Sequence, residues 1–431
     1  MHTNSRKSTL TLCRNFLAMS LEKSHASRIT NPTPEDMSKR IFFSVGEPSG
    51  DQHAARLITH LKQAFPEIQT TGFGGEAMQA AGCDIELDLT KHAVVGILEV
   101  LPKLREFFGF ADQAEAIFKS GEIDAVVLVD FPGFNWHIAK RAKRYGIPVY
   151  YYCPPQLWAW GGWRVRKMRR LVDHVLTVLP IEQSYFTKHN IPATYVGHPF
   201  FDAVALAELD EQLLARFAKQ TEAGDQLVAV LPGSRTHEVH RTWPVMLESI
   251  RRLAKSEPSA KFLVAAYRDR HCLWCRNQLT AADANLPIEF YVDRTSEVIE
   301  AARCAMMVSG SVSLELMARR TPAAVTYRIG RFLYAFAKMV VKLDSITLPN
   351  LMSPRKVFPE FISVGSTQPA VDFLTQSVGA MLHDEFYYRQ TLKTIDELCH
   401  QHAGGGATEK AATWIGEKVT GRSDQGIRRA A

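Results

Sequence analysis

The segment Leu-Pro-Gly-Ser-Arg at 231–235 has residue types suited to binding a phosphate. It ends an apolar run, so Gly233 would let the backbone turn tightly and Ser234 would cap the helix that follows. Backbone N–H groups at a helix N-terminus bind phosphate, and the guanidinium of Arg235 would add a pair of parallel hydrogen bonds. The alternative is an ordinary capped turn that carries a surface arginine.

A second turn, Ser-Gly-Ser-Val-Ser-Leu-Glu at 309–315, repeats this arrangement further along the chain. Ser309 and Gly310 precede a predicted helix, Ser313 lies at its start, and Glu315 lies within its first turn or so. The carboxylate of Glu315 would accept hydrogen bonds from ribose hydroxyls, or would only favour the helix dipole. Neither turn is a P-loop, because no G-x-x-x-x-G-K-[ST] segment occurs in the sequence. Together the two turns predict a nucleoside diphosphate site without a Mg²⁺ cage.

The segment Gly-Glu-Pro-Ser-Gly-Asp at 46–51 combines glycines, carboxylates and a hydroxyl directly after the first apolar run. At the start of a helix that points into a cleft, Glu47 or Asp51 would bind sugar hydroxyls, with Gly50 between them. Equally, Ser49 or Asp51 would only cap that helix. The segment is therefore a candidate for the acceptor side of a substrate cleft.

Asp130 is the best candidate for a general base. It follows the apolar run 125–129 and precedes a Phe-Pro-Gly-Phe-Asn segment that ends at Asn135. A carboxylate at the end of a buried strand, beside aromatic groups, has the surroundings that activate a hydroxyl. The alternative is an aspartate in a capped turn. A Gly-Phe-Gly-Gly segment at 72–75 predicts a further glycine turn, which is a weak signal alone.

An aromatic run passes directly into a basic cluster at 150–170. Such a segment suits a polyanion or a membrane surface with anionic headgroups, and the alternative is a core-packed loop followed by a solvated basic helix face. We expect the tryptophans to shape the wall of the acceptor site and the cations to contact lipid. The residues concerned are Trp158, Trp160, Trp163, Arg166, Lys167, Arg169 and Arg170.

The elements that must position these residues alternate between short apolar runs and amphipathic helical stretches. This alternation predicts parallel sheets covered on both faces, the doubly wound α/β class, with ligands at the carboxyl ends of the strands. Two such Rossmann-like domains would face one another across a cleft. We expect a basic leader at 1–40, an acceptor domain at 41–200, a UDP-donor domain at 201–365 and a C-terminal helical segment and tail at 366–431.

Composition narrows the function classes. Residues 1–40 carry +4 of the formal net charge of +6, so residues 41–431 are nearly neutral. A protein dedicated to binding nucleic acid would be expected to carry more positive charge. No run of about 18 apolar residues is present, so no transmembrane helix is predicted. The seven cysteines fit a reducing compartment, and the one close pair, Cys272 and Cys275, supplies only half of a structural zinc site.

The motifs, taken together and in order, resemble the lipid-A-disaccharide synthase family, the family-19 glycosyltransferases of lipid A assembly. The resemblance implies a B-type fold and an inverting transfer from UDP-2,3-diacylglucosamine to 2,3-diacylglucosamine 1-phosphate that gives a β-1,6 disaccharide. It also implies no metal and no cofactor, a cytoplasmic enzyme held peripherally at the inner face of the inner membrane, and a possible C-terminally swapped homodimer. The motifs that carry it are GEPSGDQHA, GFGGEAMQAAG, VVGILEVLPKL, VDFPGFN, PPQLWAW, VGHPFFD, LPGSR, SGSVSLE and LPNLM with PEFI.

The resemblance assigns roles to individual positions. Asp130 would be the base on the acceptor 6-hydroxyl, Arg235 would neutralise the leaving diphosphate, and Glu315 and Asn350 would bind the nucleotide. The acceptor loop would comprise Glu47, Ser49, Gly50, Asp51 and Asn135.

Two positions depart from the family pattern, and two apolar segments gain a lipid role from it. Gly133 stands where the family has a second aspartate, and Ser363 stands where it usually has a glutamine. The segments 94–104 and 332–343 would contact acyl chains, although ordinary helix packing also explains 332–343.

Two other functions compete with this interpretation of the sequence. One is another B-type UDP-GlcNAc enzyme, such as a peptidoglycan-type transferase or an epimerase. The other is a non-catalytic protein that binds UDP-lipid.

Overall fold

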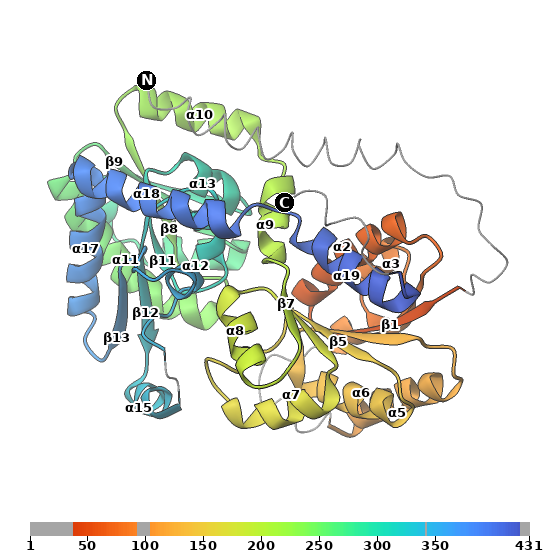
Figure 1. The fold of residues 1–431 in the computed structure, drawn as a ribbon. Helices are drawn as coiled ribbons and strands as arrows, with labels where there is room; N and C mark the ends of the chain where they lie inside the picture. Colours follow the sequence, from red (N-terminus) through yellow and green to blue (C-terminus); the bar gives the residue numbers. More distant parts are fainter. Residues whose placement is uncertain (1–37, 93–103, 341–342, 423–431) are drawn as a thin grey trace. The chain divides into compact units, whose positions relative to one another are not determined.

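The computed structural model describes residues 38–92, 104–340 and 343–422. The chain divides into two compact units (Figure 1). The first contains the described residues up to Asp202 together with those from Gly405 onward, and the second spans Ala203–Gly404. The division at Asp202 lies close to the predicted boundary between 200 and 201. The predicted leader 1–40 lies almost wholly outside the described residues.

The first unit is built on a parallel sheet of seven strands in the order β3-β2-β1-β4-β5-β6-β7. Its central strands are apolar without alternation because helices cover both faces, and all five residues of β4 are buried. Val45 of β1 lies opposite Val129 of β4, which lies opposite Tyr152 of β5, so the loops that follow these strands begin side by side. The strands are β1 (Arg40–Val45), β2 (Gln69–Gly74), β3 (Asp84–Asp88), β4 (Ala125–Val129), β5 (Val149–Tyr152), β6 (His174–Thr177) and β7 (Ala193–Tyr195).

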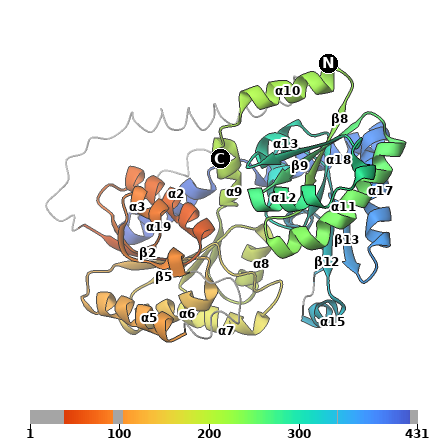
Figure 2. The same cartoon turned by 180° about the vertical axis from the view of Figure 1, so that it is seen from behind.

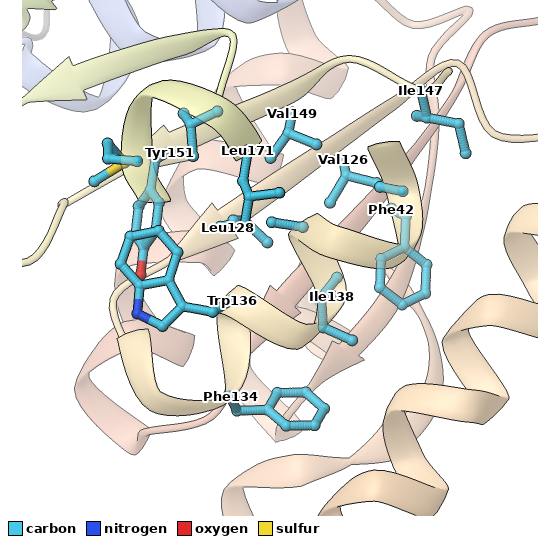
Figure 3. Packing of buried hydrophobic residues seen from close by; sticks show 14 of the residues in the cluster. Phe42, Val126, Leu128, Phe134, Trp136, Ile138, Ile147, Val149, Tyr151 and Leu171 are labelled. Atoms are coloured by element: carbon cyan, nitrogen blue, oxygen red, sulfur yellow. The ribbon is translucent and has the colours of Figure 1, made fainter. Parts of the chain in front are cut away.

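The core of the first unit lies between this sheet and the helices on its faces. Figure 3 shows part of it: Phe42, Val126 and Leu128 from the strands meet Trp136 and Ile138 from α6. The helices and 3₁₀ turns are α2 (Pro48–Ala64), α3 (Glu76–Ala80), η2 (Leu89–His92), α5 (Leu104–Lys119), α6 (Pro132–Arg144), η4 (Gly162–Arg164), α7 (Val165–Leu171) and α8 (Pro180–Lys188). The division between the two units falls within α9 (Pro199–Leu206).

The last helix, α19 (Ala407–Thr420), returns to the first unit and packs along α2 (Figures 1 and 2). A Cβ on Gly416 would lie 2.2 Å from the ring of Phe65, so the helix and that ring meet without a side chain between them. The predicted segment 366–431 is therefore corrected, since its earlier helices belong to the second unit and α19 to the first.

The second unit contains a parallel sheet of six strands in the order β10-β9-β8-β11-β12-β13. Leu231 at the end of β8 pairs with Met307 near the end of β11, which brings the starts of the two predicted donor turns to neighbouring strands. The strands are β8 (Gln226–Leu231), β9 (Ala260–Ala266), β10 (Ile288–Val292), β11 (Cys304–Val308), β12 (Ala323–Ile329) and β13 (Glu360–Val364).

Helices cover both faces of this sheet, and the two parallel sheets together confirm the predicted doubly wound α/β class. No helix in the described ranges is long and apolar enough to cross a bilayer. The helices and the 3₁₀ turn of the second unit are α10 (Glu211–Glu222), α11 (Thr236–Ser256), α12 (Asp269–Asn277), η5 (Ala281–Asp283), α13 (Thr295–Ala301), α14 (Val312–Ala318), α15 (Arg331–Val340), α16 (Leu348–Met352), α17 (Gln368–His383) and α18 (Glu385–His402).

Candidate functional site

The loops after β1 and β4 in the first unit pack directly against one another. A Cβ on Gly46 would lie 2.1 Å from the ring of Phe131, and a Cβ on Gly50 would lie 3.9 Å from the Cβ of Asp130. Glycine is therefore required at position 46, since any side chain there would displace the ring of Phe131. The structure thus brings together the predicted acceptor loop and the predicted base.

Asp130 occupies a constrained position at the end of β4. Its φ is +46° and that of Phe131 is +44°, so two consecutive non-glycine residues adopt the left-handed conformation. Such strain is characteristic of functional sites, where the surrounding structure must hold it in place. Burial raises the pKa of the Asp130 carboxyl, and a hydrogen bond from the backbone of Phe131 partly opposes that rise. A half-buried carboxylate with a raised pKa is a stronger base than an exposed one.

Asp51 does not point outward as a sugar ligand would. Its side chain is only 5% exposed, and its two carboxylate oxygens accept hydrogen bonds from the backbone of Gly75, Ala77 and Met78 at 2.8, 2.9 and 3.3 Å. It therefore caps the N-terminus of α3, the helix after β2, rather than its own helix. Glu47 and Ser49 of the same loop are exposed.

Asn135 was expected in the acceptor loop, and the structure corrects this. Its side chain is 0% exposed and cannot reach a substrate. Its amide nitrogen donates to the main-chain carbonyl of Asp130 at 2.7 Å, and its amide oxygen accepts from the hydroxyl of Ser44 at 2.6 Å. The residue holds the β4–α6 turn from inside. Gly72 is likewise within β2 rather than in a turn, with a φ of +147° and no room for a Cβ beside Phe43.

The loop between β5 and α7 shows the tryptophans in different environments. The indole N–H of Trp158 donates to the carboxylate of Glu182 at 3.3 Å, which ties the loop to α8. Trp160 and Trp163 are 50% and 72% exposed, and the guanidinium of Arg164 stacks over both rings. Trp158 is therefore fixed within the first unit, whereas Trp160 and Trp163 lie at its surface, and the role of the three tryptophans in the acceptor wall stays a prediction.

The cations of α7 follow on the same surface. Arg166, Arg169 and Arg170 are exposed, and Lys167 lies over the ring of Trp136 at 5.2 Å. Within the ranges that the structure describes, these four residues form no ion pair with a carboxylate. The first unit therefore presents uncompensated positive charge beside two exposed indoles.

The predicted donor turn of the second unit is formed as expected at Gly233. Its φ is +126°, and a Cβ there would lie 2.9 Å from the Cβ of Glu238. Ser234 is exposed but is not the helix cap. Arg235 is the N-cap residue of α11, and Glu238 accepts from its backbone N–H at 3.2 Å and from its guanidinium at 3.0 Å. The Arg235 side chain is 67% exposed, so it remains available to an anion.

The second donor turn is held by its own hydroxyls. Ser309 donates to the carbonyl of Ile346 at 2.6 Å, and Ser313 donates to that of Gly310 at 2.8 Å, which leaves Gly310 exposed. Glu315 is 8% exposed, and its Oε1 accepts from the hydroxyl of Ser296 at 2.6 Å.

A buried ion pair holds the Glu315 carboxylate. Arg319 is 4% exposed and lies 3.0 Å from both Glu315 and Glu300. Both hydrogen bonds that the structure gives to Glu315 fall on Oε1, so a ribose hydroxyl would have to approach through Oε2.

Asn350, which was expected to bind the nucleotide, has its side-chain amide engaged within its own unit. The side chain is 6% exposed. Its oxygen accepts from the backbone of Val357 and Phe358 at 2.7 and 3.0 Å, and its nitrogen donates to the carbonyl of Phe358 at 2.8 Å. Every polar atom of the amide is engaged, so Asn350 shapes the chain that leads into β13.

The two departures from the family pattern lie in different surroundings. Gly133 is exposed, and a Cβ there would meet no atom within 4 Å. Ser363 is 1% exposed in β13, and its hydroxyl has no hydrogen-bond partner within the described chain. An aspartate would therefore fit at position 133, whereas a glutamine at position 363 would need more space.

Of the two segments expected to contact acyl chains, most of 332–343 lies within the described residues. Residues 94–103 lie outside the described residues. Helix α15 follows the end of β12 (Figure 1). Its side chains Phe332, Leu333 and Met339 are 94%, 56% and 76% exposed. Ordinary packing against its own unit does not cover this apolar surface.

The sequence analysis did not identify the buried polar residues that support the candidate site. Glu182 is 1% exposed, accepts backbone hydrogen bonds from Val178 and Leu179, and has a pKa raised to about 7 by burial. Tyr151 and Arg319 are equally buried. The only sequence signal for Glu182 was its place at the third position of a helix, where glutamate often caps the preceding turn.

Comparison with known proteins agrees with the motifs. The family model described as lipid-A-disaccharide synthetase matches residues 41–395. A lipid-A-disaccharide synthase of Trichlorobacter lovleyi is 32% identical over 378 residues, which cover 87% of this chain and 96% of that protein. The chain belongs to the lipid-A-disaccharide synthetase family. Another member, from Coxiella burnetii strain CbuG_Q212, is 30% identical over 88% of this chain and 98% of its own. The chain is accordingly a glycosyltransferase of lipid A biosynthesis.

Solved structures agree on the fold of this lipid-A-disaccharide synthetase family member. The UDP-GlcNAc 2-epimerase from Neisseria meningitidis bound to UDP-GlcNAc is 12% identical, has a TM-score of 0.56, and covers 87% of this chain and 98% of its own. The calicheamicin glycosyltransferase CalG4 is 13% identical with a TM-score of 0.52, and covers 89% and 99%. At such low identity the likeness establishes the B-type fold alone.

Proposed function

We propose that this chain transfers 2,3-diacylglucosamine from UDP-2,3-diacylglucosamine to the 6-hydroxyl of 2,3-diacylglucosamine 1-phosphate. The products are a β-1,6 disaccharide and UDP. Membership of the family and the position of Asp130 support this proposal. Asp130 is a half-buried carboxylate with a raised pKa, at the end of a strand, beside the glycine loop after β1.

Asp130 acts as the general base. It takes the proton of the acceptor 6-hydroxyl while that oxygen forms a bond to C1 of the donor sugar. The bond from C1 to the diphosphate breaks in the same step, and the electron pair leaves with UDP. Attack opposite to the leaving group inverts the anomeric carbon, which gives the β linkage.

Arg235 compensates the charge that develops on the departing diphosphate. Its guanidinium is mostly exposed at the N-terminus of the long helix α11, where backbone N–H groups also favour an anion. Glu238 pairs with it at 3.0 Å and orients the side chain before substrate binds. Electrostatic stabilisation of this kind typically contributes a factor of about 10²–10³ to kcat.

The chain works at the inner face of the inner membrane through a peripheral surface on the first unit. That surface comprises Trp160, Trp163, Arg166, Arg169 and Arg170, where exposed indoles and unpaired cations suit anionic headgroups. The exposed apolar side chains of α15 on the second unit contact the acyl chains of the lipid substrates. Exchange of α19 between two copies, across the connector Gly404–Gly406, would give the swapped homodimer.

Liposome sedimentation tests the membrane surface. Each basic residue near an anionic surface contributes about 1 kcal/mol, so replacing Arg166, Arg169 and Arg170 by alanine should weaken partition to anionic vesicles by about 100-fold at low salt. Unchanged partition would show that these arginines do not bind the membrane. A matched control removes the same charge from exposed positions elsewhere by replacing Lys255, Arg389 and Lys393 with alanine.

The transfer itself is tested with both purified lipid substrates by following UDP release and the disaccharide by mass spectrometry. Wild-type protein should form the disaccharide, and Asp130→Asn should form at least about 100-fold less per unit time. Asp112→Asn is the matched control, since it removes a 68% exposed carboxylate paired to Arg141 and should leave the rate unchanged. Turnover of UDP-GlcNAc without lipid would instead favour an epimerase.

A further inference from the structure

The most strained backbone in the candidate site is the step from Asp130 to Phe131, and two buried side chains hold it. The φ values of +46° and +44° place both residues in the left-handed region, which non-glycine residues rarely adopt. The extended conformation of β4 ends at Val129, so the backbone changes to the left-handed conformation at Asp130, the residue proposed as the base.

The main-chain carbonyl of Asp130 accepts two short hydrogen bonds. The hydroxyl of Tyr151 donates to it at 2.7 Å from the neighbouring strand β5, and the amide nitrogen of Asn135 donates at 2.7 Å from the first turn of α6. Both donors are 0% exposed. Because the carbonyl of Asp130 lies in the plane of the peptide group that joins Asp130 to Phe131, fixing its oxygen fixes that plane and constrains ψ of Asp130 and φ of Phe131.

The two donors are themselves held in place. The amide oxygen of Asn135 accepts from the hydroxyl of Ser44 at 2.6 Å, and its nitrogen also approaches the carbonyl of Ser44 at 3.2 Å. The ring of Tyr151 packs against Trp136 with their centroids 6.0 Å apart (Figure 3). Neither side chain is free to follow a displacement of Asp130.

We propose that Tyr151 and Asn135 are positioning residues for the transfer: they clamp the Asp130 carbonyl and so aim its carboxylate at the acceptor hydroxyl. The proposal rests on Asp130 being the base of the proposed function. It explains why a buried tyrosine and a buried asparagine converge on one carbonyl at the site where the backbone is strained. It also gives Asn135 a role that does not require substrate contact.

Tyr151→Phe removes one hydroxyl from a buried site and keeps the ring, so the protein should fold. Loss of one of the two donors should let the Asp130 step relax and move the carboxylate. A misplacement of about 1 Å costs on the order of 100-fold in rate, so we expect kcat to fall between about 10- and 100-fold. KM for both lipids should stay within about twofold, because the clamp touches neither lipid.

The pH profile separates positioning from a general loss of stability. The titratable groups that face Asp130 are the phenol of Tyr151 and the thiol of Cys153, with Arg164 acting on the former and Glu182 on the latter. Burial raises the pKa of Asp130, and a relaxed turn would hydrate the carboxylate and lower that pKa. The acid limb of kcat against pH should therefore move to lower pH in Tyr151→Phe.

Tyr150→Phe is the matched control. It removes a hydroxyl from the adjacent residue of β5, whose ring packs on Trp414 rather than beside Asp130. It should leave kcat and the acid limb unchanged. Asn135→Asp is the second test variant, since it keeps the shape but replaces the amide donor by an acceptor against the carbonyl, and it should lower kcat at least as much as Tyr151→Phe.

A kcat within twofold of wild type and an unmoved acid limb in Tyr151→Phe would overturn the clamp. Absence of transfer by the wild type would instead be a failure of the proposed function. In that case a crystal structure of Tyr151→Phe tests the clamp alone. A φ of Phe131 that leaves the left-handed region would support it, and an unchanged backbone would overturn it.

Discussion

Asp202 fastens the C-terminal helix α19 to the first unit, and removing its carboxylate should loosen that helix. One oxygen accepts from the backbone of Thr408 at 2.8 Å and from its hydroxyl at 2.7 Å, and the other accepts from the backbone of Ala407 at 3.3 Å. Asp202 is 5% exposed and Thr408 is 1% exposed, so water does not replace these bonds without local opening. The perturbation is Asp202→Ala.

The size of the effect follows from these contacts. Loss of an N-cap side chain costs about 0.5–2 kcal/mol, and each buried donor left without a partner costs about 1–3 kcal/mol. The donors of Thr408 share one end of one helix, so their penalties overlap rather than add. We expect α19 to open with a free energy lower by about 3 kcal/mol, which corresponds to amide exchange faster by about 100-fold.

Hydrogen exchange measured by mass spectrometry on peptides from 407–420 gives this quantity directly. Asp202→Asn keeps one acceptor oxygen and should show an intermediate acceleration. Peptides from α17, which belongs to the second unit, should be unaffected. Exchange across 407–420 within threefold of wild type in Asp202→Ala would refute the view that this carboxylate fastens the helix.

Three further predictions concern charge and space. Burial raises the pKa of Glu182 to about 7 in the folded protein, so the free energy of unfolding should fall by about 3 kcal/mol as pH rises from about 4.5 to about 7. In Glu182→Gln the urea concentration at the midpoint of unfolding should change less with pH over that range. Arg235→Ala should lower kcat by about 10²–10³, and Arg235→Lys should recover only part of it, as steady-state kinetics will show. Gly46→Ala should lower kcat by about 10-fold or more because its Cβ would lie 2.1 Å from the Phe131 ring, whereas Gly133→Ala, which meets no atom within 4 Å, should be silent in the same assay.

The fold and the position of Asp130 at the end of a buried strand could be predicted from the sequence because both depend on local patterns. Uninterrupted apolar runs such as 125–129 indicate strands buried on both faces, and the residue after such a run lies where parallel sheets bind ligands. Asp130 and Arg235 were predicted in this way, and both lie in loops that follow the carboxyl ends of strands. The same reasoning placed the glycine of the 231–235 turn correctly.

The direction in which polar side chains point could not be predicted. Asp51, Asn135 and Asn350 have the residue types of ligands, but each bonds to backbone groups, and Asn135 also bonds to the hydroxyl of Ser44. The partner of Asp51 at Gly75 is 24 residues away in the sequence. Such contacts depend on how neighbouring strands place their loops, and a single sequence contains no local signal for them.

Formation of the disaccharide by wild-type protein and by Asp130→Asn tests the central claim most directly. Both proteins should bind UDP equally well, since that binding is assigned to the other unit. With both lipid substrates, the wild type should release UDP and form the β-1,6 disaccharide, and Asp130→Asn should do so at least about 100-fold more slowly. Equal rates of disaccharide formation in the two proteins would contradict the assignment of Asp130 as the base.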